Sequence, residues 1–296
     1  MGLAVFFGTY LSTWICGTGN TLPELMISLM NLESKTGICG NLILNSLNQI
    51  FAFAGAGFVY SILHGAAPGV GFSKAGKSRH RFTFLIGAVV ITLGFSPFLD
   101  LTYRLNEWLL VEGSTLHTLA ASLEEETARI TQALLQMETS KEFLATLVAV
   151  AVLPALCEEW FFRGTLQSIF SKWSGNIHIG IWVSAILFST IHFQFFGFLP
   201  RLLLGAGFGY MVAASGSLWP AVLGHFVNNG VAVFAAWWFG PEWIAEGMNP
   251  GEGSLGLSEA IATGFGAASI IWSVWWLKGK TKPLKVHSQQ PSPQEW

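Results

Sequence analysis

Three short polar clusters interrupt long hydrophobic stretches of this sequence. They hold residues that could do chemistry: Glu158, Glu159 and Arg163 in the first, His192 in the second, and His225 and Asn229 in the third. An ionisable side chain inside a membrane span is costly and therefore indicates function. Outside these clusters the hydrophobic stretches are nearly free of ionisable residues. We therefore expect three helices to share one interior polar site.

Helical spacing supports such a site. Glu159 and Arg163 lie four residues apart, so they can pair along one face of a helix. Glu158 points about 100° further round and is free to face other helices. His225 and Asn229, again four residues apart, share one face of another helix.

Two further patterns suggest that the polar face is enclosed. Phe188 lies one helical turn before His192, and Gly205 and Gly209 have the GxxxG spacing on a neighbouring hydrophobic segment. Small residues at this spacing let membrane helices approach closely.

A carboxylate, two imidazoles and an amide are suited to amide hydrolysis without a covalent nucleophile. The carboxylate can act as general base on a water that one imidazole helps to position. The second imidazole and the amide can donate hydrogen bonds to the developing oxyanion. The same groups could instead form interhelical hydrogen bonds or line an ion pathway. The residues alone leave hydrolase, structural network and ion pathway open.

No metal or other cofactor is expected. One glutamate and two histidines could in principle bind zinc. Their spacing, however, is not of the HExxH type that is typical of zinc peptidases.

The composition predicts a helical integral membrane protein. Of the 296 residues, 52% are hydrophobic and 11% are charged, whereas a soluble domain has about 25% charged residues. The net charge of −2 provides no basic surface for nucleic acid. We expect an all-α polytopic membrane protein with about eight transmembrane helices and an extra amphipathic helix.

The apolar runs predict the order of these elements, since a helical span needs about 20 apolar residues. The expected spans are 2–17, 40–63, 82–101, 141–172, 177–197, 199–215, 217–239 and 259–277. Pro154 should kink the long fourth span. Residues 114–138 have the pattern of an amphipathic helix outside the bundle.

This order divides the chain into four regions. Residues 1–140 hold the N-terminal spans and an extracytoplasmic amphipathic helix, and 141–239 form the candidate catalytic core. Residues 240–279 hold the last loop and span, and 280–296 form a disordered cytoplasmic tail.

Positive charge orients the bundle. With a cytoplasmic N-terminus, ten basic residues lie inside: Lys74, Lys77, Arg79, Arg81, Arg163, Lys172, Lys278, Lys280, Lys282 and Lys285. Five lie outside: Lys35, Arg104, Arg129, Lys141 and Arg201. This excess predicts a multi-pass protein of a cell inner membrane with both termini in the cytoplasm. Cys16 and Cys39 would both lie outside, where a disulfide between them could form.

The three clusters resemble a known family. Their order on successive hydrophobic segments, Glu-Glu-x-x-x-Arg, Phe-x-x-x-His and His-x-x-x-Asn, is similar to that of the CPBP family. This family comprises type II CAAX prenyl endopeptidases and bacterial relatives in bacteriocin processing and immunity. The resemblance covers residues 141–239, about a third of the chain.

The resemblance implies an intramembrane, metal-independent glutamic endopeptidase. Glu158 would be the base, His192 would help to activate water, and His225 and Asn229 would stabilise the oxyanion. Glu159 and Arg163 would support the site.

The expected partners are a peptide or membrane-protein substrate and the lipid bilayer, with no nucleic acid. The sequence does not indicate the substrate, its prenylation or the oligomeric state. The alternative is a non-catalytic immunity or scaffold protein that uses the same residues as a polar core.

Overall fold

The computed structural model describes residues 2–18, 21–63, 81–110, 112–242, 263, 264, 266–271 and 275. These residues form helices joined by short connections, and no strand occurs among them. Within the described residues, four helices are long and apolar enough to cross a membrane: Lys35–Leu63, Ser140–Ser174, Phe198–Ser215 and Trp219–Phe239. Two shorter apolar helices are Phe82–Ser96 and Ile177–Thr190. The all-α polytopic membrane fold is confirmed.

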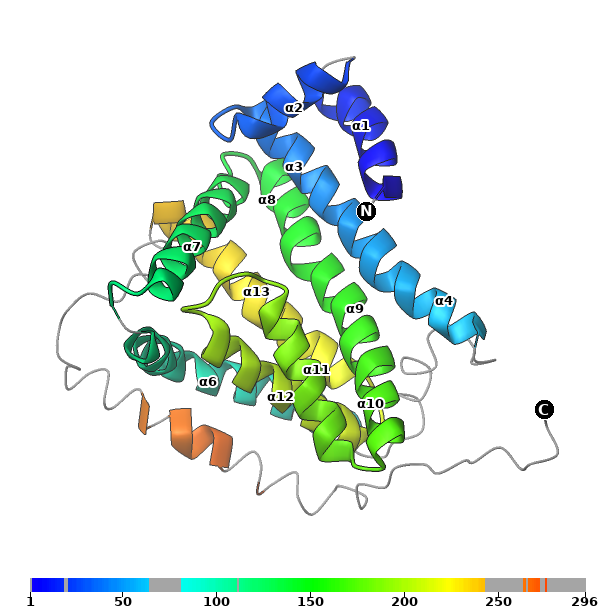
Figure 1. The fold of residues 1–296 in the computed structure, drawn as a ribbon, viewed down its shortest axis with the longest axis vertical. Coiled ribbons are helices and arrows are strands. Elements are labelled where there is room, and N and C mark those ends of the chain that lie inside the picture. The colour runs from blue at the N-terminus through cyan, green and yellow to red at the C-terminus, as the bar shows by residue number, and fades with distance from the viewer. Residues whose placement is uncertain are drawn as a thin grey trace.

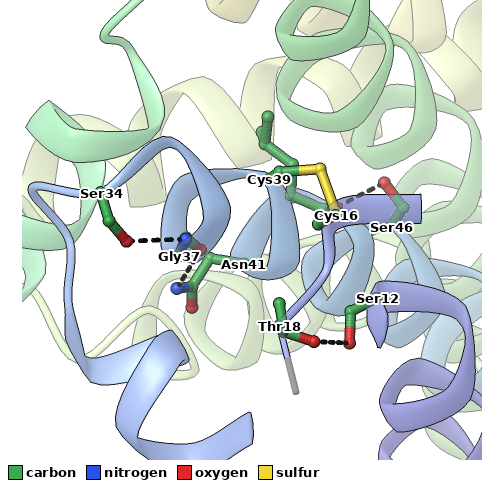
Figure 2. The surroundings of a disulfide bond; sticks show 9 residues. Ser12, Cys16, Thr18, Ser34, Gly37, Cys39, Asn41 and Ser46 are labelled. Atoms are coloured by element: carbon green, nitrogen blue, oxygen red, sulfur yellow. Dashed lines mark hydrogen bonds between the residues drawn. A yellow bond between two sulfur atoms is a disulfide. The ribbon is translucent and has the colours of Figure 1, made fainter. Parts of the chain in front are cut away.

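The N-terminal part is a helical hairpin on the outside of the bundle. It contains α1 (Gly2–Cys16), α2 (Leu22–Met30), α3 (Lys35–Asn48), the π-helical segment η1 (Gln49–Ala54) and α4 (Gly55–Leu63). The last three form one continuous helix, which packs beside the long central helix (Figure 1). A disulfide joins Cys16 of α1 to Cys39 of α3, so the pairing that the sequence left open is present (Figure 2).

The next two helices are α6 (Arg81–Leu109) and α7 (Thr115–Leu134). The side chain of Ser114 caps α7 by accepting a hydrogen bond from the backbone N–H of His117 at 3.1 Å. α7 is the amphipathic helix expected within 114–138. It lies across the side of the molecule, close to the loop between Thr190 and Phe198 (Figure 1).

The long central helix contains five successive segments. They are α8 (Ser140–Thr146), η3 (Leu147–Val152), α9 (Leu153–Glu159), η4 (Trp160–Leu166) and α10 (Gln167–Ser174). Thr139 and Glu142 form a capping box at its start. Gly175, with φ of 66°, ends it in the left-handed region that glycine tolerates best.

Pro154 deprives this helix of one backbone donor, because proline has no N–H. Val150 would pair with residue 154 in an α-helix, and Ala149 would do so in a π-helix. Asn229 Nδ2 donates to Val150 O at 3.0 Å, and Asn45 Nδ2 donates to Ala149 O at 2.9 Å. Two side-chain amides from neighbouring helices thus bind both carbonyls that could have used the missing donor.

The core is completed by α11 (Ile177–Thr190), α12 (Phe198–Ser215) and α13 (Trp219–Phe239). The predicted fifth span, 177–197, is wrong at its C-terminal end, because α11 stops at Thr190. Phe193 has φ of 53°, which a continuing right-handed helix cannot contain. Residues 177–197 have the hydropathy of one continuous span because Phe193, Phe195 and Phe196 keep the segment apolar beyond the end of α11.

The early end of α11 places a loop within the protein. Fourteen helical residues extend about 21 Å, less than the ~30 Å thickness of a hydrocarbon core. Non-helical backbone at membrane depth must be covered by protein or face a water-filled space. Here Asn106 donates to Phe195 O, and Glu124 accepts from Phe196 N at 3.3 Å. Side chains of α6 and α7 thus satisfy the loop's backbone.

Some expectations lie outside the described residues. These are the segment 64–80, most of the loop 240–258 and the tail 280–296. Of the predicted span 259–277, residues 263, 264, 266–271 and 275 are described, and all are helical.

Candidate active site

A buried network joins the first and third polar clusters. Glu159 Oε1 accepts hydrogen bonds from Arg163 Nη1 at 2.7 Å and from His225 Nδ1 at 2.8 Å. The side chains of Glu159 and Arg163 have no exposed surface. The ion pair predicted from their spacing is therefore present, and His225 from α13 extends it.

Arg163 also reaches α12. Its Nη2 donates to Gly205 O at 3.0 Å, and its guanidinium lies 4.6 Å from the centroid of the Phe188 ring. A Cβ on Gly205 would lie only 3.0 Å from Arg163 Nη2, and one on Gly209 would lie 2.8 Å from Gln167 Oε1. The two glycines thus allow the close approach that their spacing predicted.

Glu158 faces away from this ion pair, as its position on the helix predicted. Its side chain is buried, and Oε1 accepts a hydrogen bond from Gln49 Nε2 at 2.8 Å. Oε2 is buried without a hydrogen-bond partner and lies 3.9 Å from His225 Nε2. One oxygen of the buried Glu158 carboxylate is therefore hydrogen-bonded, and the other has no hydrogen-bond partner.

Gln49 is a site residue that the sequence reasoning missed. It is the first residue of η1, which packs against α9, so it reaches Glu158 from the N-terminal region. The search of the sequence counted ionisable side chains, and glutamine is neutral. The signal that would have found Gln49 is a polar amide inside an apolar span, since such groups seek interhelical hydrogen bonds.

His192 lies just after α11, in the loop. Its Nδ1 is 2.7 Å from Phe188 O, a backbone acceptor, so Nδ1 carries the proton and Nε2 keeps a lone pair. The rings of Phe188 and His192 meet edge to face at 4.9 Å, and those of Phe188 and His225 at 5.9 Å. Phe188 therefore packs between the two histidines.

The loop after His192 is held by helices outside the predicted core. Glu124 of α7 accepts from Gln194 Nε2 at 3.4 Å, and Gln194 Oε1 accepts from Arg201 Nη2 at 2.6 Å. Burial raises the pKa of the Glu124 carboxyl, outweighing the opposing effects of the Phe196 N–H and the Arg201 charge. α7 thus supports the segment that carries His192.

Asn229 sits against the long helix, two turns before Glu158. Its Nδ2 donates to Val150 O at 3.0 Å, and its Oδ1 accepts from Asn228 Nδ2 at 3.1 Å. One of its two N–H groups is thus used for structure. An oxyanion role would use the second N–H.

The structure brings four of the predicted residues together in a chain of contacts at 2.7, 2.8 and 3.9 Å: Arg163, Glu159, His225 and Glu158. His192 approaches them through Phe188, and Asn229 lies on the same helix as His225. Two π-helical segments, η1 and η4, begin at Gln49 and directly after Glu159. Such segments are frequent at functional sites.

In the described part of the chain, no three His, Cys, Asp or Glu side chains are grouped so as to hold a metal ion. Cys157 is a buried free thiol next to Glu158. A buried cysteine in such a position acts as a small packing residue.

Comparison with known proteins relates part of the chain to a peptidase family. Residues 140–231 match the family model described as type II CAAX prenyl endopeptidase Rce1-like. The resemblance seen in the three motifs is confirmed over these residues, which include all six predicted site residues. Together with the apolar helices, the match shows a membrane protein that is similar to this endopeptidase family over its core helices.

A curated relative matches over a similar length. A stretch of 100 residues, 32% of this chain, is 29% identical to the uncharacterized protein YpbD of Bacillus subtilis (strain 168). The match spans about half, 47%, of that relative's length. No solved structure matches the chain.

Proposed function

We propose that the protein is an intramembrane endopeptidase in which Glu158 activates the attacking water. The observation that carries the proposal is the state of Glu158. Its carboxylate is buried among apolar helices, and one oxygen is hydrogen-bonded while the other has no partner. A buried polar atom without a partner is rare in native structures and is often associated with catalysis.

The reaction is a direct hydrolysis. Glu158 Oε2 takes one proton from the water as the water oxygen attacks the substrate carbonyl carbon. The electrons of the carbonyl π bond move to its oxygen, which becomes an oxyanion. When the intermediate collapses, the amine leaves and takes the proton from Glu158. The products are a carboxylic acid and an amine, the acid's proton then passes to the amine to give a carboxylate and an ammonium group, and Glu158 is again ionised.

The two imidazoles have different roles in this proposal. His192 Nε2 keeps its lone pair and helps to position the water. His225 is fixed through Nδ1 on Glu159, so Nε2 faces the reaction centre. In this proposal His225 carries a proton on both ring nitrogens, so that Nδ1 donates to Glu159 while Nε2 and the second N–H of Asn229 donate to the oxyanion. Glu159 and Arg163 act by holding His225 and α12 in place. No metal or cofactor takes part.

One set of contacts favours the alternative, a non-catalytic immunity or scaffold protein. Glu159, Arg163, His225 and Asn229 all make hydrogen bonds that join α13 or α12 to the long helix. A polar core would need nothing more of them. The alternative does not explain why Glu158 is buried with Oε2 unpartnered and without the arginine that pairs with Glu159, since a buried unpaired carboxylate costs stability.

The substrate class in this proposal is a peptide or membrane protein within an inner membrane, with both termini of the peptidase in the cytoplasm. The Cys16–Cys39 disulfide supports this orientation. Structural disulfides persist in oxidising compartments, and both cysteines lie at the end predicted to be outside.

A peptidomic comparison tests the proposal. Membranes that contain the wild-type protein are compared with membranes that contain the Glu158→Gln variant at equal abundance. Cleavage products present only with the wild type support an endopeptidase. Identical peptide profiles would instead support the polar-core alternative.

A further inference from the structure

Gln49 and Glu158 together leave two buried acceptors unused. Gln49 is 6% exposed and Glu158 is 5% exposed. Gln49 Nε2 donates to Glu158 Oε1 at 2.8 Å, whereas Gln49 Oε1 and Glu158 Oε2 are both buried without a partner. The opposite orientation of the amide would place two acceptors against each other, so the assignment of the donor follows from the contact.

Packing fixes the position of this amide. One turn after Gln49, the Phe53 ring lies 5.7 Å from the Phe161 ring and 5.9 Å from the Phe162 ring. One turn before it, Asn45 is hydrogen-bonded to Ala149 O on the long helix. Contacts one turn before and one turn after Gln49 therefore hold it against the long helix, which carries Glu158.

A single water can satisfy both acceptors, because a water molecule has two hydrogens to donate. The distance of 3.9 Å between His225 Nε2 and Glu158 Oε2 is too long for a direct hydrogen bond and suits a contact through water. A water that donates to Gln49 and Glu158 directs its remaining lone pairs away from both groups. This is the orientation that attack on a carbonyl requires.

We propose that Gln49 is a further residue of the catalytic site. Its Nε2 fixes the carboxylate of Glu158, and its Oε1 shares with His192 Nε2 the one hydrogen of the water that does not pass to Glu158. This inference rests on the proposed endopeptidase function. It places part of the site outside residues 140–231, the segment that matches the peptidase family.

The chain offers a matched control in Gln167. This residue is also a buried amide, 4% exposed, whose Nε2 donates to Gly209 O at 3.1 Å and whose Oε1 has no partner. It lies on the same long helix as Glu158 but more than two turns away. Replacing either glutamine by methionine removes a buried amide while keeping a similar volume.

The test measures kcat, KM and the unfolding temperature of Gln49→Met and Gln167→Met on a substrate found by the peptidomic comparison. Only Gln49→Met is expected to lower kcat, by about 10- to 100-fold, with KM unchanged. In the double variant Gln49→Met with Glu158→Gln, kcat should equal that of Glu158→Gln alone. Gln49→Asn, which keeps a buried amide for folding, should also lower kcat because the shorter side chain cannot reach both partners.

The outcomes separate this inference from the proposed function. If the wild type cleaves and Glu158→Gln does not, but Gln49→Met and Gln49→Asn keep the kcat of Gln167→Met, then Gln49 has no catalytic role. A loss in the double variant that equals the product of the two single losses would also overturn the inference. If the wild type cleaves no peptide, the endopeptidase itself is refuted, and the role of Gln49 with it.

Discussion

Replacing Arg163 by methionine should destabilise the protein strongly, because it leaves a carboxylate buried beside a single histidine. The variant loses the bonds from Nη1 to Glu159 and from Nη2 to Gly205 O, at 2.7 and 3.0 Å. Breaking a buried ion pair costs about 3–5 kcal/mol in soluble proteins. The bond from His225 to Glu159 is present in both the wild type and the variant, so it does not offset this cost. We therefore expect a loss of about 3–5 kcal/mol.

Two comparison variants test whether the loss of stability in Arg163→Met comes from the broken ion pair. Glu158→Gln keeps an oxygen for the Gln49 amide and should cost less than about 1 kcal/mol. The double variant Glu159→Gln with Arg163→Met leaves no lone charge and should be more stable than Arg163→Met alone. Unfolding is followed in detergent micelles for all the variants, with folded yield as a second readout. If Arg163→Met were as stable as Glu158→Gln, or if the double variant showed the sum of both losses, the structural ion pair would be refuted.

Three further predictions concern the surroundings of the site. Because burial raises the pKa of Glu124 in the folded state, its contribution to stability is fully present below the unfolded pKa and is lost as the pH rises through the folded one. As the pH falls from about 7 to about 5, the unfolding temperature of the wild type should thus rise relative to that of Glu124→Gln. Parallel curves of unfolding temperature against pH would contradict this. Asn229→Ala should lower both stability and kcat, the latter about 10²–10³-fold, whereas Asn45→Ala should lower stability alone; equal kcat values would exclude an oxyanion role for Asn229. A single cysteine introduced at 74–81 or after 280 should resist an impermeant external reagent, and one at 245–255 should react, since the native cysteines are disulfide-bonded or buried; labelling of the tail would reverse the orientation.

The sequence was most informative where local geometry decides the contact. The pairing of Glu159 with Arg163 and the edge-to-face contact of Phe188 with His192 follow from helical spacing, and both are present. The all-α fold follows from the long apolar runs, because a helix satisfies the backbone hydrogen bonds of such a run within the membrane.

The parts that the sequence did not predict depend on contacts between distant segments. Gln49 contacts Glu158, which is 109 residues away in the sequence, and no periodicity of the sequence predicts this contact. The end of α11 at Thr190 depends on Asn106 and Glu124, which satisfy the backbone of an apolar loop. Hydropathy cannot distinguish such a loop from a helix, because both are rich in phenylalanine.

The most direct test of the central claim is the cleavage rate of purified Glu158→Gln protein on a substrate that the wild type cuts. The glutamine keeps the shape and the hydrogen bond to Gln49 but cannot accept the proton of a water. The account predicts a loss of about 10²–10⁴-fold in kcat with an unfolding temperature close to that of the wild type. A folded Glu158→Gln protein with the full wild-type rate would contradict it.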